Sequence, residues 1–138
     1  EGVKGLGKLF KHRYQLQRFG RGGFIRICLQ TKAPLIPVAI VGAEEIHPMI
    51  GKASWLAGML GTPYLPVTPT FPWLGMLGMI PLPTKWTIQF GKPWDFSHYP
   101  ASAINNGTLI NKLSQGVRAE IQDMIVQRLR DRRSIWTG

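Results

Sequence analysis

The residues with the clearest capacity for chemistry are the cations and glycines of residues 1–23, EGVKGLGKLFKHRYQLQRFGRGG. The cations are Lys4, Lys8, Lys11, Arg13, Arg18 and Arg21. Glycine lets the backbone approach a phosphate closely, and the cations supply the opposite charge. The Walker spacing G-x-x-x-x-G-K-[ST] does not occur, so this is no P-loop. Without other information, a solvated basic loop fits the same residues.

The histidines and the single cysteine offer less. His12, His47 and His98 are scattered, and none has an acid four or five residues further on or an obvious serine nucleophile to pair with. Cys28 lies in the apolar run FIRICL, where a small core residue is the expected role. No histidine–cysteine cluster has metal-binding spacing, so we expect no metal site.

Composition limits the class of protein. With 44% hydrophobic and 17% charged residues, a chain of 138 residues is expected to form one folded domain. One cysteine excludes an internal disulfide framework and fits a reducing compartment. The net charge of +10 predicts an acidic partner, which could be nucleic acid, anionic lipid or a phosphorylated small molecule. No charged residue lies between Lys52 and Lys85, so the charge is strongly segregated.

The elements that would position the basic loop follow it directly. The stretch RGGFIRICLQTKA predicts a helix of about three turns that begins near Gly23. The run PLIPVAIVG then predicts a short strand buried on both faces, as in a parallel sheet, with Pro37 near its start. A helix followed by such a strand is half of a βαβ unit.

The rest of the chain divides at prolines and glycines. Residues 54–83 are apolar but too often broken by proline to span a membrane, which needs roughly 20 uninterrupted apolar residues. They predict two short helical pieces joined by an extended strip. In KWTIQFGKPWDF, Trp86, Ile88 and Phe90 alternate with polar residues, which predicts a strand with one covered face. A long helix follows, and its apolar face is Leu113, Val117, Ile121, Met124 and Ile125.

Taken in order, three segments resemble a known family. Glu1-Gly2, the Phe-x-x-Gly element at Phe19 and Gly22, and Ile36-Pro37-Val38 look like motifs of the glycerolipid and phospholipid acyltransferases, the superfamily that includes 1-acylglycerol-3-phosphate acyltransferases. The segments FIRICL and VGAEE also look like the diacylglycerol acyltransferase-like branch. The resemblance covers roughly residues 1–95.

The resemblance implies an α/β fold, namely the C-terminal part of a mixed, mostly parallel sheet flanked by helices, with a C-terminal amphipathic helix. Residues 1–103 would be the C-terminal part of an acyltransferase domain that starts inside a Phe-Pro-Glu-Gly block. Residues 104–138 would form the amphipathic helix packed on the same domain.

The resemblance also implies a reaction in phospholipid and glycerolipid metabolism. An acyl thioester donor, acyl-CoA or an acyl carrier protein, would transfer its acyl group to a glycerolipid acceptor hydroxyl, and no other cofactor is implied. In the family a His-x-x-x-x-Asp motif supplies the general base. The motif is missing here, because Gln17, Lys52 and Ala103 stand five residues after the three histidines. We therefore expect this chain to be a fragment that is inactive alone.

The acceptor-binding residues implied are Glu1, Gly2, Lys4 and Lys8. The family places an arginine where Lys4 stands, and lysine cannot form the bidentate phosphate contact that arginine forms. A 1-acylglycerol-3-phosphate acceptor and a neutral acylglycerol acceptor therefore both remain open.

The aromatic residues of the uncharged stretch predict a membrane contact. Trp55, Tyr64 and Trp73 are the residue types that anchor proteins at a lipid interface, so we expect a peripheral position on the cytoplasmic face of an anionic membrane. The same aromatics could instead fill the core around an acyl tunnel. Two further classes stay open, a catalytically inactive membrane-binding domain and a basic nucleic-acid-binding module. No nucleic-acid motif is present, and we expect no nucleic-acid partner.

Overall fold

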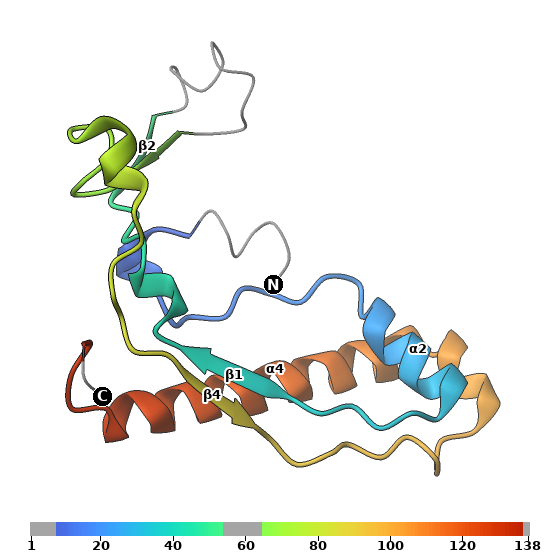
Figure 1. The fold of residues 1–138 in the computed structure, drawn as a ribbon. Helices are drawn as coiled ribbons and strands as arrows, with labels where there is room; N and C mark the ends of the chain where they lie inside the picture. The colour runs from blue at the N-terminus through green and yellow to red at the C-terminus, as the bar shows by residue number, and fades with distance from the viewer. Residues whose placement is uncertain (1–7, 54–64, 137–138) are drawn as a thin grey trace. The chain divides into compact units, whose positions relative to one another are not determined.

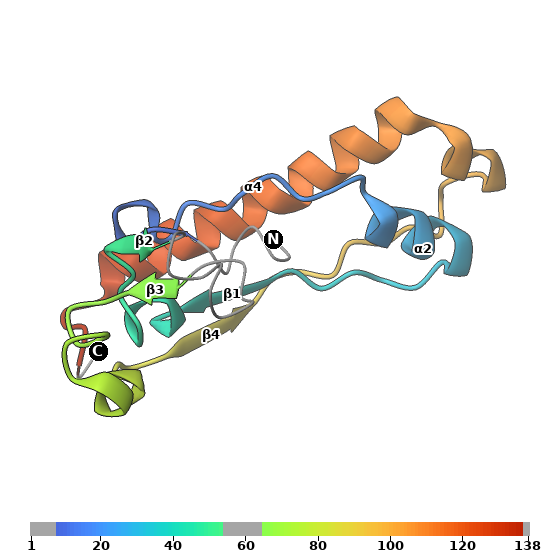
Figure 2. The ribbon, with the colours of Figure 1, turned by 90° about the horizontal axis from the view of Figure 1, so that it is seen from above.

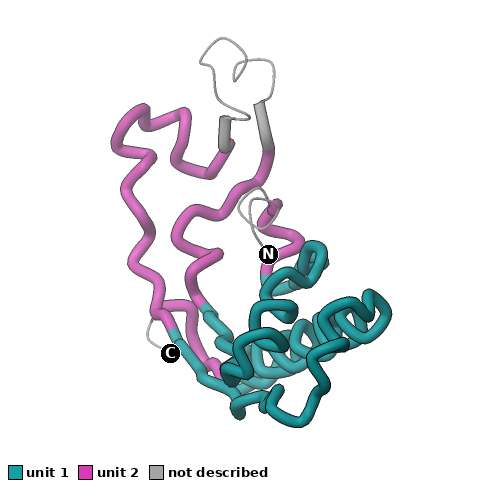
Figure 3. Tube along the Cα trace, turned by 90° about the vertical axis from the view of Figure 1, so that its right-hand side faces the viewer, with its two compact units in different colours: residues 1–6, 14–41, 87–131 teal, residues 7–13, 42–86, 132–138 magenta. Residues whose placement is uncertain are grey.

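The computed structural model describes residues 8–53 and 65–136. They form two compact units, coloured separately in Figure 3. Unit 1 contains residues 14–41 and 87–131, and unit 2 contains residues 8–13, 42–53, 65–86 and 132–136. Five residues with predicted roles lie outside the described residues: Glu1, Gly2, Lys4, Trp55 and Tyr64.

Unit 1 is a small α/β arrangement of two helices and one two-stranded sheet. Its helices are α2 (Gly23–Thr31) and α4 (Gly107–Asp131), with the short 3₁₀ helix η4 (Ala101–Asn105) before α4. Its strands are β1 (Val38–Val41) and β4 (Thr87–Phe90). In Figures 1 and 2, α4 runs along one side of this strand pair.

The predicted mostly parallel sheet is wrong. β1 and β4 pair antiparallel, with Val38 opposite Phe90 and Val41 opposite Thr87, and the described strands include no parallel pair. The expectation that β1 is buried on both faces also fails, because Ala39 and Val41 are buried whereas Ile40 is 44% exposed. An apolar run of this length is compatible with either arrangement, and only the partner strand decides. Pro37 directly precedes β1, as predicted.

β4 alternates as predicted, but its covered face is the polar one. Ile88 and Phe90 are 54% and 70% exposed, whereas Thr87 and Gln89 are partly covered. The α4 side chain Arg128 donates a hydrogen bond from Nε to Gln89 Oε1 at 2.7 Å, so the polar face of β4 faces the helix. The two strands therefore expose an apolar face on the side opposite α4.

The core of unit 1 lies on α4 and confirms the predicted apolar face of this helix. Towards the N-terminal half of α4, a first cluster joins Ile25 and Leu29 of α2 with Phe96, Ile110 and Val117. Towards its C-terminal half, a second cluster joins Tyr14 and the inward residues of β1 with Met124 and Ile125. Asn106 begins the helix, because its side-chain oxygen accepts a hydrogen bond from the Leu109 N–H at 3.0 Å.

A glycine inside α4 has a packing reason. A Cβ on Gly116 would lie 2.8 Å from Cη2 of Trp94, so the tryptophan ring rests directly on the helix backbone. The Trp94 indole N–H also donates to the Glu120 carboxylate one turn further on. Glycine in a helix costs about 1 kcal/mol relative to alanine, and the close packing of this ring offsets that cost.

Unit 2 contains only short elements. They are η1 (Phe10–His12), η2 (Ala43–Glu45), β2 (Gly51–Ala53), β3 (Leu65–Val67) and η3 (Gly75–Met79). β2 and β3 pair antiparallel. Of the two short helical pieces predicted for the proline-rich stretch, η3 is present, β3 is part of the extended strip, and residues 54–64 are not described.

Within the described parts of the chain, no helix combines the length and the apolar character needed to cross a bilayer.

Candidate functional site: an apolar pocket at the start of α2

The candidate site is a pocket of about 540 Å³ in unit 1. Three parts of the chain line it: the loop and first turn at residues 19–24, the segment at residues 35–38, and two α4 side chains, Val117 and Ile121. The lining is mostly apolar, and Arg21 is its one charged residue. A pocket of this size and character is suited to a ligand with an extended apolar part.

Gly22 shapes the turn from the loop into α2. Its φ of +71° lies in the left-handed region, and a Cβ on it would come within 2.6 Å of Ile110 Cγ2. The Gly22 carbonyl accepts hydrogen bonds from the Ile25 and Arg26 N–H groups at 3.0 and 3.2 Å, which starts the helix. Only glycine allows this turn and this close approach to α4 together.

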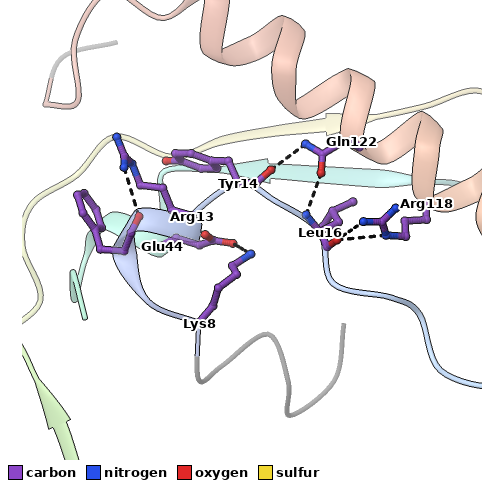
Figure 4. Close-up of polar contacts among 8 residues, drawn as sticks. Lys8, Arg13, Tyr14, Leu16, Glu44, Arg118 and Gln122 are labelled. Atoms are coloured by element: carbon purple, nitrogen blue, oxygen red, sulfur yellow. Dashed lines mark hydrogen bonds and ion pairs between the residues drawn. The ribbon is translucent and has the colours of Figure 1, made fainter. Parts of the chain in front are cut away.

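Two polar side chains of α4 hold the segment that leads to the pocket. Arg118 Nε donates to the Leu16 carbonyl at 3.1 Å (Figure 4). It also donates to the Gln17 carbonyl at 3.1 Å. Gln122 donates from Nε2 to the Tyr14 carbonyl at 2.7 Å and accepts from the Leu16 N–H at 2.8 Å. These bonds therefore fix residues 14–17 to α4, and the neighbouring α4 residues Val117 and Ile121 line the pocket.

Sequence reasoning missed Arg118 and Gln122. Their spacing of four residues places them on one side of a helix whose other face is apolar. This pattern could have indicated that the two side chains act together. The partners, however, are backbone groups about 100 residues earlier in the chain, and no local pattern identifies them.

The electrostatics of the pocket are positive at one end. Arg21 is exposed beside the N-terminus of α2, whose first turn contains no acidic residue, and Gly22 offers no capping side chain. The helix dipole adds partial positive charge at this end. The pocket thus joins apolar walls to a cationic mouth, a combination that fits an amphiphile with a polar or anionic end.

The predicted site residues that are described lie in unit 2 and do not line this pocket. Lys8 Nζ is 2.8 Å from Glu44 Oε1, and the Lys8 side chain is only 5% exposed (Figure 4). Trp73 is 76% exposed. The pocket instead contains residues of two of the family-like segments, Phe19 and Gly22 in one and Ile36–Val38 in the other.

The remaining candidates for chemistry show no cluster. Cys28 is partly buried against the first core cluster, and burial raises the pKa of its thiol, which favours the unreactive protonated form at neutral pH. Among residues 8–53 and 65–136, no three metal-ligating side chains lie together.

Comparison with known proteins finds mycobacterial relatives. The chain is 46% identical to proteins of Mycobacterium tuberculosis and Mycobacterium bovis, and 48% identical to a protein of Mycobacterium leprae, over all 138 residues. All three relatives are described as uncharacterized proteins. The chain spans 38% of the length of each of these relatives. No protein-family model matches the chain, and no solved structure does so.

Proposed function

We propose that the intact protein transfers an acyl group from an acyl thioester to a hydroxyl of a glycerolipid, and that this segment supplies part of the lipid-binding site. One observation carries the proposal. Two described segments of the acyltransferase-like pattern, the Phe-x-x-Gly element and the Ile36–Val38 segment, line a single apolar pocket.

The chemistry of the pocket fits an acyl chain. Each methylene group moved from water into an apolar site contributes about 0.8 kcal/mol, so a chain of several methylenes gains substantial affinity there. The cationic mouth at Arg21 and the α2 N-terminus suits a phosphate, a carboxylate or the oxygen of an ester or thioester.

The general base is expected outside this chain. The His-x-x-x-x-Asp motif of the resemblance is not in these 138 residues, and a base typically contributes about 10²–10⁴-fold to such a transfer. The proposal therefore concerns the full-length protein. This chain spans 38% of the length of the mycobacterial relatives.

Lys4 is the preferred contact for an acceptor headgroup. It occupies the position of the family's arginine, while Lys8, the weaker candidate, is already in an ion pair with Glu44. If the acceptor carries a phosphate, loss of one charge-assisted contact costs about 1.5–3 kcal/mol of binding.

The test is a thiol-release assay on the full-length protein. Acyl-CoA is supplied with lysophosphatidate, monoacylglycerol or diacylglycerol, and CoA release is compared with a reaction that lacks an acceptor. We expect acceptor-dependent release. For lysophosphatidate, Lys4→Ala should raise KM about 10- to 100-fold, provided that KM follows binding, and Lys4→Arg should retain activity.

The outcomes separate the alternatives. Acceptor-dependent turnover of neutral acylglycerols that Lys4→Ala leaves unchanged would replace the phosphorylated acceptor with a neutral one. If no acceptor stimulates CoA release, the full-length protein is not the proposed enzyme.

A further inference from the structure

Unit 2 presents a compact loop in which most of the large apolar side chains face solvent. We call residues 71–80 the apolar knob. Six of its members are more than half exposed: Trp73 (76%), Leu74 (58%), Met76 (86%), Leu77 (69%), Met79 (62%) and Ile80 (61%). Single exposed apolar residues are ordinary on protein surfaces, whereas six within eight positions mark an interaction site.

Hydrogen bonds to the two threonines that precede the knob hold its backbone. Thr68, which is 3% exposed, accepts a bond at Oγ1 from the Phe71 N–H at 2.8 Å and donates its own N–H to the Phe71 carbonyl at 2.9 Å. Thr70 Oγ1 donates to the Gly78 carbonyl at 3.0 Å, which ties the end of the loop to its beginning.

Gly78 makes this closure possible. A Cβ on Gly78 would lie 2.5 Å from the Thr70 carbonyl oxygen, so the two backbone segments touch. The bond from the Leu74 N–H to the Thr70 carbonyl, at 2.8 Å, adds a turn between them. Polar groups therefore form the inside of the knob and apolar side chains its outside, which is the reverse of an ordinary loop.

This inverted arrangement suits a lipid phase. Backbone groups that enter the apolar part of a bilayer must be satisfied within the protein, because lipid offers them no partner. The bonds at Phe71, Leu74 and Gly78 satisfy part of this backbone within the protein, while tryptophan, leucine and methionine side chains point outward.

The net charge of unit 2 as a whole is positive. No acidic residue occurs between Glu45 and Asp95. Unit 2 contains seven lysines and arginines against two glutamates, and both glutamates are neutralised in ion pairs, Glu44 with Lys8 and Glu45 with Arg132. The surplus positive charge favours a surface of anionic headgroups.

We propose that the apolar knob inserts into the interface of an anionic bilayer and docks the protein on the membrane. The proposal does not depend on acyl transfer, because it concerns binding alone and its test measures no turnover.

The test is co-sedimentation of the full-length protein with vesicles of phosphatidylcholine alone and of phosphatidylcholine mixed with phosphatidylglycerol. The knob variant is Met76→Ser with Leu77→Ser, two of the most exposed positions. The matched control is Ile27→Ser on α2, where the isoleucine is 62% exposed but far from the knob in sequence. Circular dichroism confirms that each variant is folded.

We expect the wild type to prefer the anionic vesicles. The knob variant should bind them about tenfold less or weaker still, at low and at high salt, because burial of apolar side chains is not screened. The Ile27→Ser control should bind like the wild type.

Equal binding of the knob variant and the wild type would overturn the proposal. So would a result in which the wild type fails to bind vesicles and the knob variant instead loses a concentration-dependent self-association. That outcome would assign the knob to a contact between two copies of the protein.

Discussion

Two adjacent glycines at the pocket mouth, Gly22 and Gly23, differ in whether a larger side chain could replace them. Gly22 has a φ of +71° and would place a Cβ 2.6 Å from Ile110, whereas a Cβ on Gly23 would meet nothing within 4 Å. We expect Gly22→Ala to destabilise the protein by about 1–3 kcal/mol through backbone strain and overpacking. Gly23→Ala should stabilise it by up to about 1 kcal/mol, because alanine is the better residue in a helix.

Thermal unfolding of the two full-length variants beside the wild type measures this difference. The midpoint should fall for Gly22→Ala and stay level or rise for Gly23→Ala. If both variants shift the midpoint equally, the left-handed turn at Gly22 is not a requirement of the pocket.

At single positions, the sequence shows which side chains could bind a ligand, but it does not show which other residues they contact. The cations of the opening segment are evident in the sequence, but their use depends on residues far along the chain. From its position in the sequence, Lys8 was predicted to contact a phosphate, yet its ammonium group forms an ion pair with Glu44. The residues near Lys8 in the sequence do not identify this partner, because the ion pair joins residues that are distant in the sequence and meet only in the folded chain.

Among the elements, the segment at residues 14–17 depends on α4. Arg118→Met removes the guanidinium that binds the Leu16 and Gln17 carbonyls while keeping most of the aliphatic stem. Loss of hydrogen bonds from a charged donor to partly buried carbonyls should cost about 1.5–3 kcal/mol of the free energy of unfolding.

Hydrogen exchange is the sharper readout, since amides at residues 14–18 should exchange faster in Arg118→Met than in the wild type. Arg128→Met is the matched control, because Arg128 is exposed and donates its hydrogen bond to a side chain, that of Gln89. Unchanged exchange in Arg118→Met would mean that the segment holds its position without α4.

The presence of the α-helices and strands of unit 1 followed from sequence, but strand pairing did not. Apolar spacing predicted α2, α4, β1 and β4 because each pattern is local. The direction of pairing is set by β4, which lies more than 40 residues after β1, and it proved antiparallel. The alternation in β4 was right in period, yet the side that α4 covers carries Thr87 and Gln89, because Arg128 provides a polar partner there.

At the scale of the whole molecule, the two units carry different kinds of surface. Unit 1 contains a pocket suited to an acyl chain, and unit 2 carries an exposed apolar knob with surplus positive charge. An enzyme that joins a thioester to a lipid needs both kinds of surface. The lack of charge at residues 53–84 led to the proposed membrane contact, but nothing in the sequence indicated that two motif segments would line one pocket.

The most direct test of the central claim is the chain-length preference of the full-length protein with Ile36→Trp. Ile36 lines the pocket and is 51% exposed, so a larger side chain there fills the pocket at little cost to folding. Ile40→Trp is the matched control, because Ile40 is 44% exposed and does not line the pocket. The measurement is kcat/KM for acyl-CoA donors of increasing chain length.

We expect Ile36→Trp to lower kcat/KM about tenfold or more for long acyl chains and much less for short ones, since the lost pocket volume excludes methylenes worth about 0.8 kcal/mol each. Ile40→Trp should keep the wild-type profile. The same chain-length profile in the wild type and both variants would contradict the account, because the pocket would then hold no acyl chain.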